Sequence, residues 1–434
     1  MSMWEDLLLF LSLKDPNVRY VVLGLILLSS SCALVGCFTF LRKRALSGDA
    51  LAHSVLPGVC LAFIITGDKQ SLPVLLGAIV FGWLSLYTMD YLKRNTILKE
   101  DTVIGLVLSV FFGIGLLLLS HIQHSDYVNP SGLDSILFGR AASLVEEDVW
   151  WFGITGVILV TVIFALLKEF VLICFDEPFA RSISIPVKML EVILTTLTVM
   201  AIVTGIQAVG VVLMAAFLIT PAAAARYWTY NIKHMLIYAA LISMSSSVAG
   251  AYVSYSFPKM PTAPWIVLVL SLVAFFSFLF SPHKGVWKRW MNMRNNSAKI
   301  LEENILKTFY HLGERENVEM GYYTEQQLNS IRGFKKSDLK KGLRKLIRLG
   351  YVKKSGQSYT LTNEGYRKGE RIVRLHRLWE LYLSNHVKIA ADHVHDDAET
   401  IEHIITPEIE QKLEELLKSP LIDPHQSSIP PSRW

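Results

Sequence analysis

The sequence predicts an all-α polytopic membrane bundle of about eight or nine transmembrane helices, followed by a cytoplasmic winged-helix domain and a second helical domain. Three observations indicate this fold class. Hydrophobic residues make up 52% of the 434-residue chain and recur in long apolar runs between residues 18 and 281. From residue 283 onward the sequence becomes charged and amphipathic. Lysines and arginines collect in alternate loops between the runs, which is typical of a multi-pass membrane protein.

The apolar runs define nine candidate spans of about bilayer length. These are residues 18–41, 50–66, 72–92, 102–121, 149–167, 187–206, 209–227, 235–255 and 264–280. The basic loops place the N-terminus outside the cell and the chain after the last span in the cytoplasm. The sixth and seventh runs could instead form one broken helix. The number of crossings would then be even, and both ends of the chain would lie on the same side of the membrane.

The N-terminal segment and the cysteines narrow the class of protein further. Residues 4–13 indicate a short interfacial helix rather than a cleavable signal peptide, because a basic start and a small-residue cleavage site are missing. The cysteines form no CxxC or paired-loop pattern, so neither a disulfide framework nor a thiolate metal site is indicated. They are Cys32, Cys37, Cys60 and Cys174.

An acid and a histidine stand where a basic stretch enters the second apolar run, in RKRALSGDALAHSVLPG. Helical spacing puts Asp49 and His53 on one face. A carboxylate and an imidazole together can hold a divalent transition ion. The two residues could instead be a helix cap and a hydrogen-bonded interior histidine. Because ionisable groups in a span are costly and usually face a pathway, the membrane setting favours the metal hypothesis.

A polar segment separates the fifth and sixth spans on the cytoplasmic side. Residues 175–188 read FDEPFARSISIPVK, with charges, two prolines and apolar residues. Such a segment could form a small helix on the membrane face that docks a partner. A plain connecting loop fits the same composition.

The cytoplasmic part begins with two helices and a hairpin. Residues 324–332 and 337–349 have helical periodicity, and residues 351–361 predict a hairpin wing. The second helix would turn four apolar residues inward, Leu339, Leu343, Leu346 and Ile347. Its other face is basic, with Lys340, Lys341, Arg344, Lys345 and Arg348. That face could neutralise DNA phosphates, or it could be a solvated surface for protein contacts.

Histidines and acids concentrate in the last part of the chain. Five of the twelve histidines lie between residues 376 and 403. His376 and Glu380 are four apart on a helix, and a second group recurs at helical spacing. Its members are His395, Glu399, Glu402 and His403. The density favours a metal site over exposed surface residues.

Three motifs in order resemble the permease subunits of bacterial ABC importers for manganese, zinc or iron over residues 18–281. They are RKRALSGDALAHSVLPGV, DEPFARSISIP and QAVGVVLMAAFLITPAAAARYW. The resemblance implies a homo- or heterodimeric pore, an extracellular metal-binding lipoprotein and two cytoplasmic ATPase subunits. Asp49 and His53 match the family's intramembrane metal ligands. The ATPase-coupling segment would comprise Asp176, Glu177, Pro178, Phe179, Ala180 and Arg181. Because the chain lacks a GxxxxGK[ST] loop, ATP hydrolysis belongs to a separate subunit.

The motifs HRLWELYL, VHDDAETIEH and DPHQSSIPP resemble the iron- and manganese-dependent, diphtheria-toxin-repressor-like metalloregulators over about residues 297–432. The resemblance implies one metal site with His376, Glu380 and His395. A neighbouring site would use Glu399, Glu402 and His403, with Glu303 as an acid from the first helix of this part. Leu306 stands where manganese-responsive members have a second acid, which would weaken the neighbouring site. Glu399 stands where iron-responsive members have a cysteine, and its harder carboxylate favours manganese.

The sequence therefore predicts the permease subunit of an ATP-driven importer of divalent metal in the bacterial cell membrane. Mn²⁺ is favoured, with Zn²⁺ or Fe²⁺ as alternatives for both transport and sensing. The runner-up is a membrane-tethered or released, metal-dependent DNA-binding regulator. The predicted segments are an interfacial start (1–17), a transmembrane domain (18–282), a basic linker (283–296), a winged-helix domain (297–365) and a helical metal-binding domain (366–434).

Overall fold

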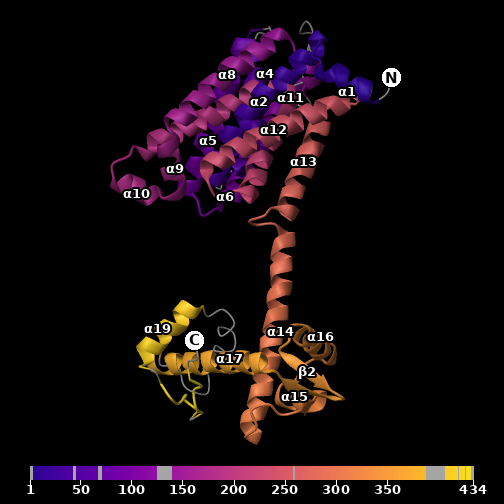
Figure 1. Ribbon diagram of the computed structural model, residues 1–434. Coiled ribbons are helices and arrows are strands. Elements are labelled where there is room, and N and C mark those ends of the chain that lie inside the picture. Colours follow the sequence, from indigo (N-terminus) through magenta and orange to yellow (C-terminus); the bar gives the residue numbers. More distant parts are fainter. Residues whose placement is uncertain are drawn as a thin grey trace. The chain divides into compact units, whose positions relative to one another are not determined.

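The computed structural model describes residues 3–42, 45–66, 71–124, 139–257, 260–387, 406–418, 420–425 and 427–431. The chain divides into two compact units, Met1–Lys288 and Arg289–Trp434 (Figure 1). Each unit has a hydrophobic core of its own.

The described residues of the first unit form a helical bundle, and eight of their helical segments are long and apolar enough to cross a membrane. In chain order the elements are α1 (Met3–Leu11), α2 (Pro16–Leu41), α3 (Ala45–Ser54), α4 (Leu56–Thr66), α5 (Ser71–Asn95), α6 (Glu100–His124), the 3₁₀ turn η1 (Ala141–Ser143), α8 (Glu146–Ala165), α9 (Leu167–Phe175), α10 (Glu177–Ser182), α11 (Val187–Trp228), α12 (Ile232–Ser256) and α13 (Thr262–Phe280). α14 (Val286–Glu316) begins at the end of this unit and continues into the second.

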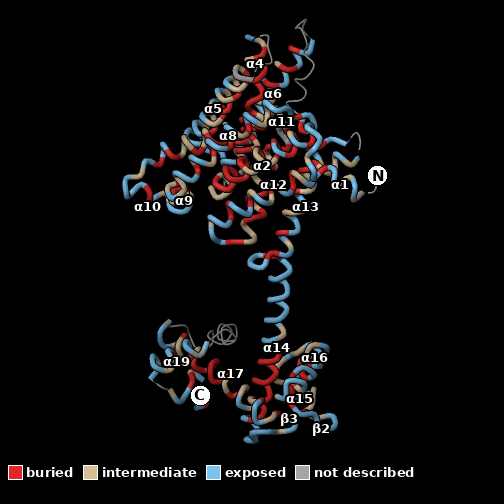
Figure 2. The backbone as a smooth tube through the Cα atoms, turned by 45° about the horizontal axis from the view of Figure 1, so that its top comes forward, coloured by how far each residue is buried: buried red, intermediate tan, exposed pale blue. Residues whose placement is uncertain are grey.

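α2 is the central helix of the bundle. Its apolar window is 78% buried, whereas that of α13 is 17% buried, so α13 lies at the periphery. α2 packs against α8, α11 and α12, and buried residues gather along these helices (Figure 2). Because most of its surface meets other helices rather than lipid, α2 carries small residues such as Gly36, which lets α11 approach closely.

The span predicted at residues 50–66 is present but broken. α3 ends at Ser54 and α4 begins at Leu56, with a turn at Val55 between them. Pro57 explains the break, because it has no N–H to donate to the carbonyl oxygen of His53 four residues earlier. The interruption therefore follows directly after the predicted ligand pair.

α11 reverses direction at Gly210. Near the end of α2, Arg42 forms an ion pair with Glu191, and Gly36 packs against the backbone of Leu218. In one straight helix Glu191 and Leu218 would be about 40 Å apart, yet both meet the last two turns of α2. Gly210 has φ 77° and ψ 167°, a conformation that glycine adopts without a Cβ clash. The two halves of α11 are therefore antiparallel helices, as in the two-run interpretation.

The described part of the second unit combines helices with one small sheet. Its elements after α14 are β1 (Tyr323–Thr324), α15 (Glu325–Ile331), α16 (Lys336–Arg348), β2 (Val352–Ser355), β3 (Ser358–Leu361), α17 (Asn363–Tyr382), the π-helical turn η2 (Leu383–Val387) and α19 (Pro407–Leu417). The strands are antiparallel in the order β1-β3-β2.

The core of the second unit forms where α14, α15, α16 and the sheet meet. Leu339, Leu343 and Leu346 turn inward from α16, and Leu306 lies fully buried on α14. Leu306 has 0% exposure in this apolar cluster and therefore contributes to core packing. Its truncation to alanine would lower the free energy of unfolding by about 2–5 kcal/mol. The cations of α16 lie on its opposite, exposed face.

Replacement of Gly36 by alanine tests the close approach of α2 and α11. The new methyl group would overlap the carbonyl oxygen of Leu218, so we expect the variant to lose roughly 1–3 kcal/mol of stability. A Gly105→Ala variant is the matched control, because a methyl group on this α6 residue would meet nothing within 4 Å. Thermal unfolding of the detergent-solubilised chain measures both. Equal midpoints for the two variants would contradict the close packing.

Candidate functional site

Asp49 and His53 face each other on α3, in the apolar bundle. Nε2 of His53 is 3.7 Å from Oδ1 of Asp49. Two atoms that share one tetrahedral metal ion at bond lengths of about 2.1 Å lie roughly 3.4 Å apart, so a small side-chain rotation brings both onto one ion. The side chain of Asp49 is 40% exposed and that of His53 is 23% exposed, which leaves room for further ligands.

The surroundings of His53 supply more unpaired polar atoms. The ring stands edge-on to Phe112 with centroids 4.8 Å apart, and its buried Nδ1 has no hydrogen-bond partner. The buried hydroxyl of Ser54 is also unpartnered. Pro57 frees the backbone carbonyl of His53, as described above. Buried polar atoms without partners are costly in an apolar setting, so a cation near this helix break would satisfy them.

A small cavity with both polar and apolar walls adjoins this site. It has a volume of about 60 Å³, enough for roughly two water molecules, and Ser47 and Gly48 of α3 form part of its wall. Asp90 and the ion pair of Lys93 with Glu100 also line it, with Nζ 2.6 Å from Oε2. Polar groups therefore continue from the neighbourhood of Asp49 to the ends of α5 and α6.

α10 is a capped helix of one and a half turns in the segment predicted for docking. The carboxylate of Asp176 accepts a hydrogen bond from the backbone N–H of Phe179 at 2.9 Å. Arg181 pairs with Glu177 one turn away, at 2.5 Å. Ala180 is fully buried and fixes the helix to the bundle. These local interactions make α10 an ordered helix rather than an irregular loop.

The outer face of this segment is apolar. Phe175 is 58% exposed, Phe179 51% and Ile183 49%. The three side chains are spaced four residues apart around α10. Aromatic and aliphatic groups in such a row are typical anchors for a groove on a partner protein.

The second unit brings His376 and Glu380 into contact on α17. Nε2 of His376 is 3.0 Å from Oε1 of Glu380, and both side chains are at most 5% exposed. Neighbouring ligands of an octahedral ion with bonds of about 2.1 Å are also roughly 3.0 Å apart, so this pair fits a shared metal. The nitrogen and oxygen donors suit manganese, iron or zinc.

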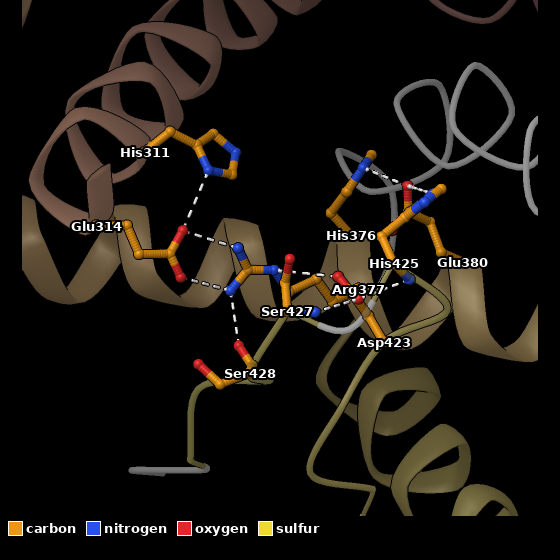
Figure 3. A network of polar contacts seen from close by, with 9 residues as sticks. All are labelled: His311, Glu314, His376, Arg377, Glu380, Asp423, His425, Ser427 and Ser428. Atoms are coloured by element: carbon orange, nitrogen blue, oxygen red, sulfur yellow. Dashed lines mark hydrogen bonds and ion pairs between the residues drawn. The ribbon is translucent and has the colours of Figure 1, made fainter.

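His425 is a further residue of this site that sequence reasoning did not single out (Figure 3). Its Nε2 is 4.0 Å from Oε1 of Glu380. The side chain is 46% exposed and lies in a tight loop whose backbone N–H groups donate to Asp423. The sequence feature that could have indicated His425 is the histidine in DPHQSSIPP. Its position in the chain does not show that it meets a helix more than forty residues earlier.

The other predicted residues of the tail are placed as follows. Glu303 lies on α14, largely buried, with a carboxylate oxygen 3.7 Å from Nζ of Lys299. Leu306 is a core residue, as described above. His395, Glu399, Glu402 and His403 lie outside the described residues. Among the residues that are described, no group of three or more His, Cys, Asp and Glu side chains is already arranged to hold a metal.

Next to the His376 and Glu380 pair, Arg377 forms a buried polar network (Figure 3). It donates two hydrogen bonds to Glu314 of α14, both at 2.8 Å. Burial raises the pKa of the Glu314 carboxyl, but hydrogen bonds from His311 and Arg377 outweigh burial and lower the pKa to about 2. Because this folded-state pKa is below the ordinary 4.5, the carboxylate stabilises the fold above pH 4.5, and this contribution is lost as the pH falls toward 2.

Comparison with known proteins decides the family. The model of the ABC 3 transport family matches residues 14–281, well over half of the chain. The chain belongs to the ABC 3 transport family. It is therefore a multi-pass membrane protein, and as a permease of this family it is a transporter component rather than an enzyme. Residues 362–431 match a second family model, the iron dependent repressor, metal binding and dimerisation domain. Both resemblances noted in the sequence are thus confirmed.

Relatives within the ABC 3 transport family differ in how much of this chain they cover. The manganese transport system membrane protein MntC of Bacillus subtilis is 38% identical over 88% of this chain and 87% of its own length. That alignment is longer than the first unit, so it includes part of the second. The zinc transport system membrane protein TroC of Treponema pallidum is 39% identical over 67% of this chain and 97% of its own length.

One solved structure supports the fold of the first unit. It is PsaBC from Streptococcus pneumoniae in complex with Fab, 31% identical with a TM-score of 0.59. The match covers 66% of this chain and 99% of that chain. Nearly the whole of that chain is therefore matched by a share of this chain about as long as the first unit.

Proposed function

We propose that this chain is the permease subunit of an ATP-driven manganese importer and that its second unit senses manganese in the cytoplasm. The observation that supports this proposal most directly is the Asp49 and His53 pair, which lies beside a helix break inside the bundle of an ABC 3 family member. Cytoplasmic ATPase subunits and an extracellular metal-binding lipoprotein are the partners that this family implies. Transport consists of binding and alternating access without covalent chemistry.

The proposed topology has nine crossings. With the two halves of α11 antiparallel, as Arg42, Glu191, Gly36 and Leu218 indicate, each half crosses once. An odd number of crossings puts the N-terminus and the second unit on opposite sides of the membrane, and the basic loops assign the second unit to the cytoplasm. α10 then lies on the cytoplasmic side, where an ATPase can reach it.

Two protein ligands leave the transit site incomplete, because divalent transition metals take four to six. The exposed part of Asp49 would face the second permease of a homo- or heterodimer, whose own acid and histidine complete the shell. The carbonyl of His53 and water are further donors. Mn²⁺ prefers such oxygen-rich, mixed sites, although Zn²⁺ or Fe²⁺ could use the same atoms. The names of the relatives include both manganese and zinc systems.

The transit site is tested by Asp49→Ala and His53→Ala. Each removes one of two ligands, so we expect uptake of radioactive manganese to fall to the level of cells that lack the chain. The control is His124→Ala, because this exposed histidine at the end of α6 bonds to the carbonyl of Ser120 in its own helix. Competition by excess zinc or ferrous iron for manganese uptake in wild-type cells shows which metals the permease accepts. Normal uptake by both α3 variants at wild-type protein levels would remove the pair from the pathway.

Coupling to the ATPase is best tested at Phe179. Substitutions of Asp176 would also remove the cap of α10, whereas Phe179 is exposed and makes no such bond with its side chain. We expect Phe179→Asp to weaken ATPase binding by roughly thirtyfold or more, the effect of losing an anchor worth about 2 kcal/mol. Co-purification and metal-stimulated ATP hydrolysis measure this. Tyr322→Asp, 63% exposed in the second unit, is the control, and unchanged binding by Phe179→Asp would make the segment a plain connection.

For the second unit we propose a winged-helix domain followed by a metal-binding domain. α15 and α16 would be its paired helices and β2 and β3 its wing. His376, Glu380 and His425 form the described part of the metal site. The four residues outside the description, His395, Glu399, Glu402 and His403, would complete this site and its neighbour. The carboxylate at position 399 favours manganese there as well.

Sensing is tested by ending the chain at Lys288, the limit of the first unit. Relatives that correspond to the first unit alone indicate that this part can suffice for transport. We expect the shortened permease to import manganese but to lose the slowing that follows when internal manganese rises. Initial uptake rates in cells preloaded with different manganese concentrations measure the response. A shortened permease that still slows would refute the proposed role.

DNA binding is the second candidate function, and one surface favours it. A cavity of about 570 Å³ beside α16 and the hairpin is lined by Lys336, Lys340 and Lys354. Cations on a recognition helix and a wing could neutralise phosphates. Tight, manganese-dependent and sequence-specific DNA binding by the full chain would establish regulation as a joint function.

A further inference from the structure

The C-terminal loop, residues 421–425 and 427–431, is held to α17 by two arginines. One is Arg374, which donates to the carbonyl of Pro430, and the other is Arg377. An isolated bridge joins Ile422 and Ser428, and Asp423 accepts hydrogen bonds from two backbone N–H groups within the loop. Arg377 donates to the carbonyl of Ser428 at 2.7 Å, and its Nε lies 3.5 Å from Oδ2 of Asp423. The loop is therefore a compact unit, and the guanidinium group of Arg377 is one of its two attachments to α17.

The same guanidinium holds α14. Its two terminal nitrogens bond separately to the two carboxylate oxygens of Glu314, a planar fork that a lysine could not reproduce (Figure 3). The side chain of Arg377 is 6% exposed, so these bonds form largely out of water. Glu314 lies two residues before the end of α14, and α14 is the stretch of chain that leads out of the first unit.

Metal binding would move this loop. His425 is part of it, and its Nε2 is 4.0 Å from Oε1 of Glu380. If both atoms bound one ion, their separation would shorten to roughly 3.0 Å, which would draw His425 and the loop that carries it about 1 Å toward α17. Asp423 and Ser428 move with the loop, and both are attached to Arg377.

We propose that Arg377 is a positioning residue that couples metal occupancy at His376, Glu380 and His425 to the end of α14. It passes a shift of the C-terminal loop to Glu314, because one rigid guanidinium is bonded to both. The inference rests on the proposed metal sensing by the second unit and adds the path by which occupancy reaches the helix between the units. An arginine that only fastened the loop would not need the forked bond to α14.

The chain offers a matched control on the same helix. Arg371, six residues earlier on α17, also donates two hydrogen bonds to one carboxylate, both to Oε2 of Glu410, at 3.2 and 2.8 Å. This carboxylate belongs to α19. Loss of its bonds to Arg371 leaves the bonds from Arg377 to the loop and to Glu314 in place.

The test uses the full chain in lipid nanodiscs with Asp49→Ala and His53→Ala, so that the proposed transit site does not contribute. Mn²⁺ is the probe, and loss of its free electron-paramagnetic-resonance signal counts bound ions. Hydrogen exchange of residues 305–316 reports α14. In this background we expect Mn²⁺ to slow exchange about tenfold, an ordinary allosteric coupling. Glu314→Gln should bind as many ions but lose this slowing, whereas Arg371→Lys should keep it.

The outcomes separate the inference from the function on which it rests. If the parent chain binds no Mn²⁺ in its second unit, the proposed sensing and the coupling both fail. If it binds Mn²⁺ and Glu314→Gln still shows the full slowing, only the coupling fails. Loss of Mn²⁺ binding in Glu314→Gln would also overturn the coupling, because the contact would then build the site rather than transmit its state.

Discussion

A carboxylate in a membrane bundle must have a partner, and much of the first unit can be understood from that requirement. Asp49 finds His53 one turn away, but neither residue is saturated by the other at 3.7 Å. Pro57 then ends the helix hydrogen bonding where a free carbonyl is useful, directly after His53. A continuous helix would have used that carbonyl internally. In the transit site that we propose, the break would add a backbone oxygen to the acid and histidine pair, a donor that hard divalent cations favour.

Close helix packing supports this site from a distance. α3 lies in contact with α6 and α11, and the ring of Phe112 on α6 fixes the orientation of His53. α11 can reach α2 because Gly36 has no side chain and because Gly210 permits the reversal. These contacts make the position of α3 depend on α11. The proposed coupling helix α10 immediately precedes α11, separated from it by only four residues. A partner that displaced α10 would thus act on the scaffold of the metal pair through a short path.

The sequence predicted features that depend on local pattern and missed those that depend on distant contacts. Hydropathy located the spans, and i to i+4 spacing placed Asp49 with His53 and His376 with Glu380, because these signals lie within one or two helical turns. The break at Val55 could have been inferred from Pro57, but in a continuous apolar run the hydrophobic signal dominates. His425 and the bond from Arg377 to Glu314 could not be inferred. The latter joins residues 63 apart in the chain, and only the packing of α14 against α17 brings them together.

The tail also illustrates how one substitution redirects a metal domain. At Leu306 an apolar side chain fills the core between α14 and α17, where an acid would need a cation or a hydrogen-bond partner. Without a ligand from that position, α14 is tied to the metal-binding helix by Glu314 and Arg377 instead. A direct metal bond would make α14 part of the site itself. In our proposal, the salt bridge from Arg377 to Glu314 would instead let α14 respond to the neighbouring site of His376, Glu380 and His425.

Thermodynamic reciprocity sets a requirement on any sensor fused to its own transporter. If manganese in the second unit shifts the permease toward a resting arrangement, that arrangement must bind the sensing metal more tightly by the same factor. A factor of about ten, roughly 1.4 kcal/mol, would slow import without stopping it. The ion must also exchange within the time over which internal manganese changes. A site of partly exposed histidine and carboxylates meets that need better than a closed thiolate site, because His425 is half-exposed and can leave and rejoin without opening the core. Under this proposal the exposed His425 would exchange with the cytoplasm while its loop passes occupancy to Arg377, and the buried His376 and Glu380 would remain as fixed ligands.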